Sequence, residues 1–138
     1  MPLPTNITLE VVTPEGLLLR EVVDEVIAPG GEGYFGVRPG HTPFLSTLGV
    51  GEIAYRRGTV WRHLTCFWGF CEVLPDRVNI LAEAGERAED IDLRAAEQAR
   101  ARAADQMKAI KDEAGYNEAH GAYVEAVTRL TVGRKHQG

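Results

Sequence analysis

Several features that mark particular functions are scarce in this chain of 138 residues. It has two cysteines and a single serine, Ser46. Its apolar stretches, such as residues 16–19, fall far short of the roughly 20 residues that span a bilayer. The formal net charge is -5, so the chain lacks the basic excess that nucleic-acid binding requires. We therefore expect no nucleic-acid partner and no direct membrane insertion.

A secretory signal and a metal site are also unsupported. Residues 1–6 carry neither a positive charge nor an apolar run, so we expect Cys66 and Cys71 to remain reduced thiols. Together with His41 and His63, these cysteines fit no common zinc-ligand spacing. Cysteines on strands more often belong to a core, and we predict no metal.

Catalytic motifs are missing as well. The sequence holds no G-x-S-x-G or H-E-x-x-H motif, and Ser46 has no recognisable catalytic partner. Residues 31–36 match G-x-G-x-x-G, but a dinucleotide site requires a helix to begin there, and Pro39 and Pro43 follow instead. A glycine-rich surface loop is the better interpretation. No catalytic residue is assigned, which disfavours a small β-sandwich enzyme.

The chain changes composition near residue 84. All seven prolines lie between Pro2 and Pro75, ten of the fifteen glycines precede residue 85, and alanine rises from four before that point to twelve after it. Proline and glycine mark turns, whereas alanine is the best helix former. We therefore predict a β domain over residues 1–84 and a helical domain over residues 85–138.

Short runs rich in β-branched and aromatic residues recur through the first domain between turn signals. This spacing is typical of a sandwich or a barrel. The expected strands are 7–12, 17–23, 25–28, 34–37, 44–48, 53–56, 60–67, 70–74 and 78–82.

The helical part of the second domain opens with Asp90 and Asp92, which favour a helix N-terminus. One apolar face then predicts a helix of about six turns, with Gly115 as its C-cap. That face comprises Leu93, Ala96, Ala103, Met107, Ile110 and Ala114, with Arg100 interrupting it.

A second helix is predicted from Asn117, a plausible N-cap, and it fades by Gly133. Its apolar face comprises Tyr116, Ala119, Tyr123, Val127 and Leu130. A short link predicts an antiparallel two-helix hairpin. Because the first helix offers mostly alanine for burial, both a mobile regulatory hairpin and a permanently docked one stay open.

Three segments carry a resemblance to a known family. They are residues 23–30 (VDEVIAPG), 33–45 (GYFGVRPGHTPFL) and 69–78 (GFCEVLPDRV). In this order they resemble the epsilon subunit of the rotary F-type ATP synthase. The resemblance covers nearly the whole chain and implies a ten-stranded β-sandwich followed by a C-terminal antiparallel two-helix hairpin.

The resemblance also implies a role. Members of this family are non-catalytic rotor subunits of the central stalk, which couple rotation of the ion-driven membrane ring to ATP synthesis in the catalytic head. The implied partners are the gamma subunit, the ring of c subunits, and the beta subunits when the helices extend. The implied location is peripheral, on the cytoplasmic face of the bacterial inner membrane. A free-standing ATP-binding regulatory protein is the alternative.

Site residues follow from the same resemblance. Gly31, Glu32, Gly33 and Tyr34 match the family's ring-facing loop, although an acidic residue often stands at the position of Tyr34, so Glu32 is the candidate for a charge contact. The segment near gamma is matched by Pro39, Gly40 and His41.

The helices carry two further candidates. Past Glu125 the chain has Arg129, Arg134 and Lys135 and no acid, and the resemblance implies that such basic residues meet acidic groups on the beta subunit and restrain ATP hydrolysis.

Some bacterial members bind ATP through an I-D-x-x-R-A motif. Here Ile91 and Asp92 match it, but Arg94 arrives one position early and Ala95 takes the usual place of the arginine. One position is about 100° around a helix, so Arg94 points away from such a site. ATP binding is therefore doubtful, and no other cofactor is expected.

Overall fold

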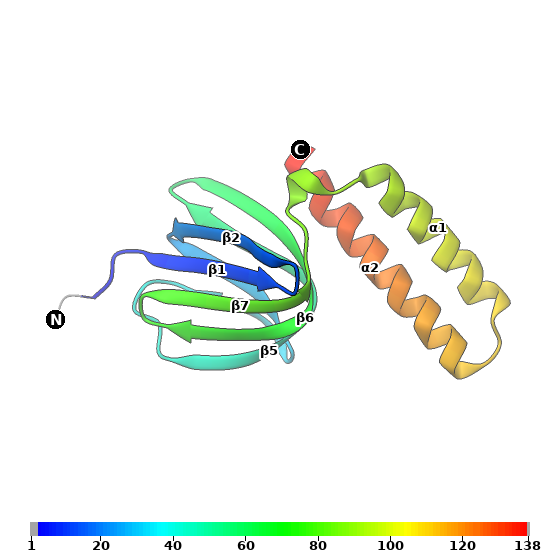
Figure 1. The fold of residues 1–138 in the computed structure, drawn as a ribbon, viewed down its shortest axis with the longest axis horizontal. Helices are drawn as coiled ribbons and strands as arrows, with labels where there is room; N and C mark the ends of the chain where they lie inside the picture. Colours follow the sequence, from blue (N-terminus) through cyan, green and yellow to red (C-terminus); the bar gives the residue numbers. More distant parts are fainter. Residues whose placement is uncertain (1–2, 138) are drawn as a thin grey trace.

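A computed structural model of the chain describes residues 3–137, in a β domain and a pair of helices (Figure 1). Seven strands come first along the chain, followed by a short 3₁₀ helix and then by a pair of long helices. The elements are β1 (Ile7–Thr13), β2 (Gly16–Val23), β3 (Glu25–Gly30), β4 (Gly33–Val37), β5 (Phe44–Arg57), β6 (Val60–Leu74), β7 (Arg77–Ala84), η1 (Ala88–Asp90), α1 (Leu93–Ala109) and α2 (Glu113–Gln137).

The strands hydrogen-bond in the order β2-β1-β7-β6-β5-β3-β4. Neighbours are antiparallel except β1 and β7, which are parallel. The sheet folds over into two layers around a core to which alternate strand residues contribute, as Ile7, Leu9 and Val11 of β1 show by their complete burial. This period of two is the one that a strand with one buried face requires. The fold is a β-sandwich.

The prediction of ten strands is wrong, because the described residues form seven. The expected strands 44–48 and 53–56 are parts of β5, and 60–67 and 70–74 are parts of β6. The pairing of β5 with β6 runs from Phe44 opposite Val73 to Arg57 opposite Val60. Each of the long, bent strands β5 and β6 therefore takes the place of two shorter predicted strands.

The bend in β6 has a local cause. Trp68 and Gly69 have φ angles of 62° and 152°, and a Cβ on Gly69 would overlap the backbone of Leu81 and Ala82. Glycine is the residue that tolerates both the positive φ and the close approach. The sequence predicts a break between strands 60–67 and 70–74, whereas the structure bends one strand at Gly69 without ending it.

The link between the helices differs from the prediction. Helix α1 ends at Ala109, with Ile110 extended at its C-cap. The Asp112 side chain then accepts a hydrogen bond of 2.9 Å from the Gly115 amide, which is an N-cap contact for α2. Gly115 therefore lies in the first turn of α2 and does not cap α1, and Asn117 is not an N-cap.

The end of α2 also differs, because the helix continues through Gly133 to Gln137. A Cβ on Gly133 would lie 2.7 Å from a methyl of Leu93 and 3.1 Å from one of Ile91. This glycine therefore allows close packing against the start of α1 and does not end the helix.

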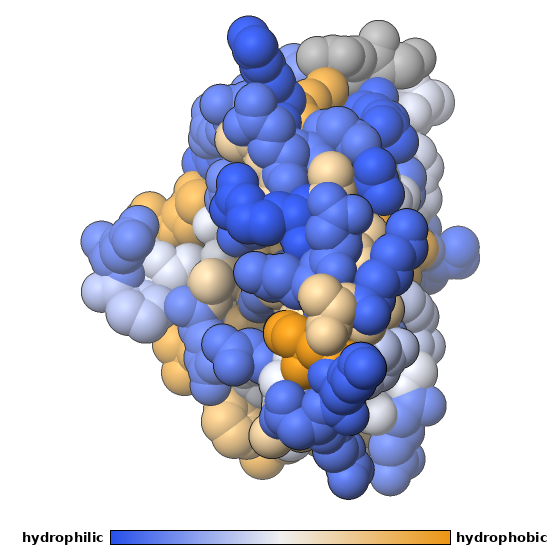
Figure 2. Space-filling model, turned by 90° about the vertical axis from the view of Figure 1, so that its right-hand side faces the viewer, coloured by the Kyte–Doolittle hydropathy of each residue, from blue (hydrophilic) through white to orange (hydrophobic). Residues whose placement is uncertain are grey.

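Helix α2 runs back alongside α1, so that its C-terminal end reaches the sandwich (Figure 1). The buried residues of α1 are two alanines, Ala96 and Ala103. The outward face of the helix pair is mostly hydrophilic (Figure 2). The helices are thus held by a narrow apolar contact and by their attachment to the sandwich.

Candidate functional site

The buried thiols have no catalytic character. Cys66 and Cys71 are free and fully buried, and burial raises the pKa of each to about 12. A nucleophilic cysteine requires the opposite shift, because the thiolate is the reactive form. Within residues 3–137, no group of three or more histidine, cysteine or acidic side chains is arranged to hold a metal ion.

The predicted ring-facing loop is the turn between β3 and β4. The Gly31 amide donates a 2.9 Å hydrogen bond to the Thr47 carbonyl, and Glu32 is exposed at the tip. Tyr34 is 61% exposed, but its hydroxyl accepts a 3.0 Å hydrogen bond from the Glu52 amide. Tyr34 is therefore tied to β5, and Glu32 is the one charged residue of this loop.

The predicted gamma-contact residues form the next loop, between β4 and β5. Gly40 has a φ of 83°, and its amide donates a 2.8 Å hydrogen bond to the Pro75 carbonyl. Its neighbours Pro39 and His41 are half-buried and line a surface hollow of about 340 Å³ with Glu25 and Arg38. The loop is thus fixed to the β6–β7 turn and borders a charged hollow.

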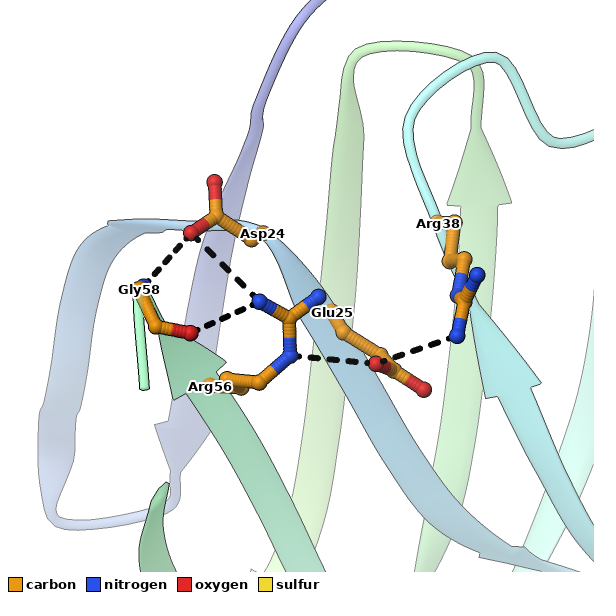
Figure 3. Close-up of polar contacts among 5 residues, drawn as sticks. All are labelled: Asp24, Glu25, Arg38, Arg56 and Gly58. Atoms are coloured by element: carbon orange, nitrogen blue, oxygen red, sulfur yellow. Dashed lines mark hydrogen bonds and ion pairs between the residues drawn. The ribbon is translucent and has the colours of Figure 1, made fainter. Parts of the chain in front are cut away.

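Glu25 and Arg38 of that hollow also belong to a polar network with Asp24, Arg56 and Gly58 (Figure 3). Arg56 of β5 lies 3.2 Å from Glu25 and 3.8 Å from Asp24, and it donates to the Gly58 carbonyl at 2.8 Å. Arg38, which is far more exposed, approaches the same Glu25 carboxylate at 3.7 Å. Arg56 therefore anchors Glu25, while Arg38 stays available at the surface.

The outer face of the sandwich carries an apolar row that crosses four neighbouring strands. Leu17 pairs with Val12, Val12 with Leu81, and Leu81 with Phe70. Phe70, Leu81 and Leu17 are 63%, 60% and 60% exposed, and all of the row except Leu17 borders a hollow of about 350 Å³. Contiguous exposed apolar side chains of this kind mark interaction surfaces.

Two of the three predicted inhibitory basic residues contact the sandwich and the segment that leaves it. Arg129 pairs with Glu86 at 2.7 Å and lies over the Phe67 ring at 5.0 Å. Lys135 pairs with the Glu52 carboxylate. Arg134 is exposed. The C-terminal part of α2 is therefore attached to the sandwich through its positively charged side chains.

The residues of the doubtful ATP motif lie at the start of α1. The Asp92 side chain accepts a 3.0 Å hydrogen bond from the Ala95 amide and so caps the helix. Ile91 packs with Ala88 and Val132, and Arg94 is exposed. In this arrangement Asp92 and Ile91 have structural roles, and the expectation that ATP binding is doubtful stays a prediction.

Sequence reasoning missed the apolar row and the acidic partners of α2. A signal for the row was present, since 81 and 70 are outward positions of their strands and still carry leucine and phenylalanine. No comparable signal existed for Glu52 and Glu86, because 83 and 43 residues separate them from their partners.

The comparisons with known proteins bear on both the sandwich and the helices. Residues 6–88 match the family model described as ATP synthase, Delta/Epsilon chain, beta-sandwich domain. The ATP synthase epsilon chain of Syntrophobacter fumaroxidans is 50% identical over 130 residues, which cover 94% of this chain and 97% of that protein. The chain belongs to the ATP synthase epsilon chain family. The resemblance carried by residues 23–45 and 69–78 is thereby confirmed.

A second epsilon chain, from Nitratidesulfovibrio vulgaris (strain DP4), is 43% identical over 127 residues and covers 92% of this chain and 95% of that protein. Among solved structures, a chain of the Euglena gracilis mitochondrial ATP synthase, OSCP/F1/c-ring in rotational state 1, has a TM-score of 0.82 at 22% identity. That likeness covers 93% of this chain and 81% of the other, so the shared fold includes the helices. Within residues 3–137, no helix has both the length and the apolar character to cross a bilayer.

Proposed function

We propose that this epsilon chain is a non-catalytic rotor subunit in the central stalk of an F-type ATP synthase. In this role it couples ion-driven rotation of the membrane ring to ATP synthesis in the catalytic head. It binds peripherally, at the cytoplasmic face of the bacterial inner membrane. Family membership favours this role over that of a free-standing ATP-binding regulator.

The apolar row of Leu17, Val12, Leu81 and Phe70 is the observation that carries the proposal. Leu17, Leu81 and Phe70 remain largely exposed in the isolated chain and Val12 is half-buried, although full burial of one such side chain is worth roughly 1.5–3 kcal/mol. A rotor subunit needs a lasting contact with the shaft that it turns with. We assign this row to the gamma subunit.

The two loops extend the same arrangement. The loop of Pro39, Gly40 and His41 is assigned to gamma, since the β6–β7 turn fixes it and the exposed Arg38 beside it, which shares Glu25 with Arg56, can make a polar contact at the rim. The turn at residues 31–34 is assigned to the c ring, with Glu32 supplying its charge. Polar groups around an apolar centre are the usual composition of a protein interface.

The helices are assigned a regulatory role as an antiparallel hairpin. When they extend, Arg129, Arg134 and Lys135 meet acidic groups of the beta subunit and restrain ATP hydrolysis. In the docked arrangement Arg129 and Lys135 already pair with Glu86 and Glu52. Docking on the sandwich and inhibition at the beta subunit therefore require the same side chains, Arg129 and Lys135, so the two states exclude each other.

The test is a pull-down of tagged variants from host membranes. We expect Phe70→Asp to reduce recovery of gamma and the ring at least tenfold, because a buried, unpaired carboxylate would face the partner. Val60→Asp is the matched control, since Val60 is 54% exposed outside the row. Normal recovery of gamma with Phe70→Asp, in a protein that folds, would refute the assignment.

A further inference from the structure

At the junction of the sandwich and α2, one acidic side chain contacts two basic side chains from different elements. The two oxygens of the Glu52 carboxylate on β5 are divided between His63 Nδ1 on β6, at 2.6 Å, and Lys135 Nζ on α2. The Glu52 and His63 side chains are only 14% and 21% exposed, and that of Lys135 is 42% exposed. The carboxylate is therefore shielded from bulk water on most sides.

The charge of this trio depends on the histidine. With a neutral imidazole donating from Nδ1, Glu52 and Lys135 form a balanced pair. A protonated imidazole adds a second positive charge against the same carboxylate, and Lys135 then shares its one counter-ion. Histidine is the side chain whose charge ordinarily changes between pH 5 and pH 8.

The surrounding groups strengthen this effect. The cleft that His63 and Lys135 line is also bordered by Trp61 and Arg62 of β6, Ala88 and Glu89 of the η1 segment, and His136 of α2. Glu89 lies 4.0 Å from Arg62, which offsets its charge. Protonation of His63 therefore places a positive charge beside Lys135, Arg62 and His136, with Glu52 as its near counter-ion.

We propose that Glu52, His63 and Lys135 form a proton-sensitive latch, which loosens the C-terminal end of α2 from the sandwich when His63 becomes protonated. The latch is a property of the isolated chain and goes beyond the rotor role. Arg129 pairs with Glu86 and lies over the Phe67 ring, and so provides a second attachment that uses neither Glu52 nor His63. Acidification therefore frees the end of α2 before the rest of the helix.

Amide hydrogen exchange of the full isolated chain tests the latch. Exchange in residues 131–137 is measured from about pH 5.5 to pH 8 and normalised to the intrinsic rate at each pH, with the β7 amides as internal reference. We expect the opening equilibrium of this segment to rise about two- to fivefold on acidification, the range that a partly exposed ion pair supports. An unchanged opening equilibrium would overturn the proposal.

Three variants test whether His63 causes this pH dependence. His63→Gln should abolish the pH dependence, and Lys135→Gln should give the open level at every pH. His136→Gln is the matched control, because His136 lines the same cleft, and it should keep the pH dependence. Retained dependence in His63→Gln, or its loss in His136→Gln, would overturn the assignment to His63. None of these readouts involves gamma or the ring, so they are independent of the pull-down.

Discussion

The sandwich and the helix pair bury side chains of different size. The sandwich core is built from leucine, isoleucine and valine, many of them completely buried, as Leu9, Ile53 and Ile80 are. The buried residues of α1 are two alanines, and the cluster at the base of the helices has only three buried members, Ala88, Ile91 and Val132. Hydrophobic stabilisation scales with buried apolar area, so it is concentrated in the sandwich.

This contrast shows that different kinds of interaction hold the two domains together. Sheet hydrogen bonds and a large core hold the sandwich together. The helices rely on small residues that allow close contact and on ion pairs such as that of Arg129 with Glu86. Exposed and half-buried ion pairs contribute little and respond to salt and charge. The sandwich is suited to a fixed docking role, and the helices to a reversible one.

The largest expected effect is the loss of sandwich stability at high pH. The pKa of Cys66 rises from 9.0 to about 12 because of burial, and that of Cys71 does the same with smaller contributions from Cys66 and Glu72. Because the folded pKa lies above the unfolded one, the native state keeps the proton, and this stabilisation is lost as pH rises from about 9 towards 12. We expect the sandwich to lose roughly 4 kcal/mol between about pH 9 and pH 11.

Urea unfolding followed by near-ultraviolet circular dichroism at several pH values checks this expectation. A Cys66→Ala/Cys71→Ala double variant is the control and should show a shallower decline. Tyr55 still titrates in that variant, because burial and the nearby Glu21 carboxylate raise its pKa from 10.0 to about 12. Equal slopes in the two proteins would contradict the role of the thiols.

The next test removes volume from the sandwich core. Ile80→Ala, on a central strand where the side chain is 1% exposed, should lower the free energy of unfolding by about 3 kcal/mol, because a cavity remains. Urea denaturation measures this loss. A loss below about 1 kcal/mol would mean that the core collapses around the change and is not close-packed.

The smallest effect concerns the two glycines in the body of α2. Gly133→Ala should loosen the packing of α2 on α1 by about 1–2 kcal/mol, because the new methyl would lie 2.7 Å from Leu93. Gly121→Ala is the matched control, with open space around its Cβ, and should stabilise the helix by about 0.5–1 kcal/mol. Helix content on heating, followed by far-ultraviolet circular dichroism, separates them. Equal shifts in the same direction would show that Gly133 is not a packing residue.

Local patterns predicted the elements well. Strands β1 and β7 follow the alternation of residues 7–12 and 78–82, since period-two burial is visible in the sequence itself. Glycine is where prediction failed. Gly69 bends a strand, Gly115 lies in a first helical turn and Gly133 packs between helices, yet near each of them the sequence predicted that an element ends. What a glycine does depends on the backbone or side chain that approaches it, which lies elsewhere in the sequence.

The candidate site divides in the same way. Residues 31–34 and 39–41 were assigned through the family resemblance, because each loop is contiguous in the chain, and both assignments stay predictions. The row of Leu17, Val12, Leu81 and Phe70 was not found, since sheet pairing assembles it from four strands. Tyr34 shows the limit within a loop, because its hydroxyl is bound to Glu52 across the sheet.

By itself the sequence determined which stretches form strands or helices, where the composition changes, and to which family the chain is similar. These properties are encoded in neighbouring residues, through side-chain periodicity, turn chemistry and helix propensity. The tertiary structure alone decided that strands 44–48 and 53–56 continue through a bend, that Gly133 packs against Leu93, and that Lys135 and His63 share Glu52. Those outcomes depend on contacts between residues far apart in the chain, whose pairing only the folded sheet and the returning helix establish.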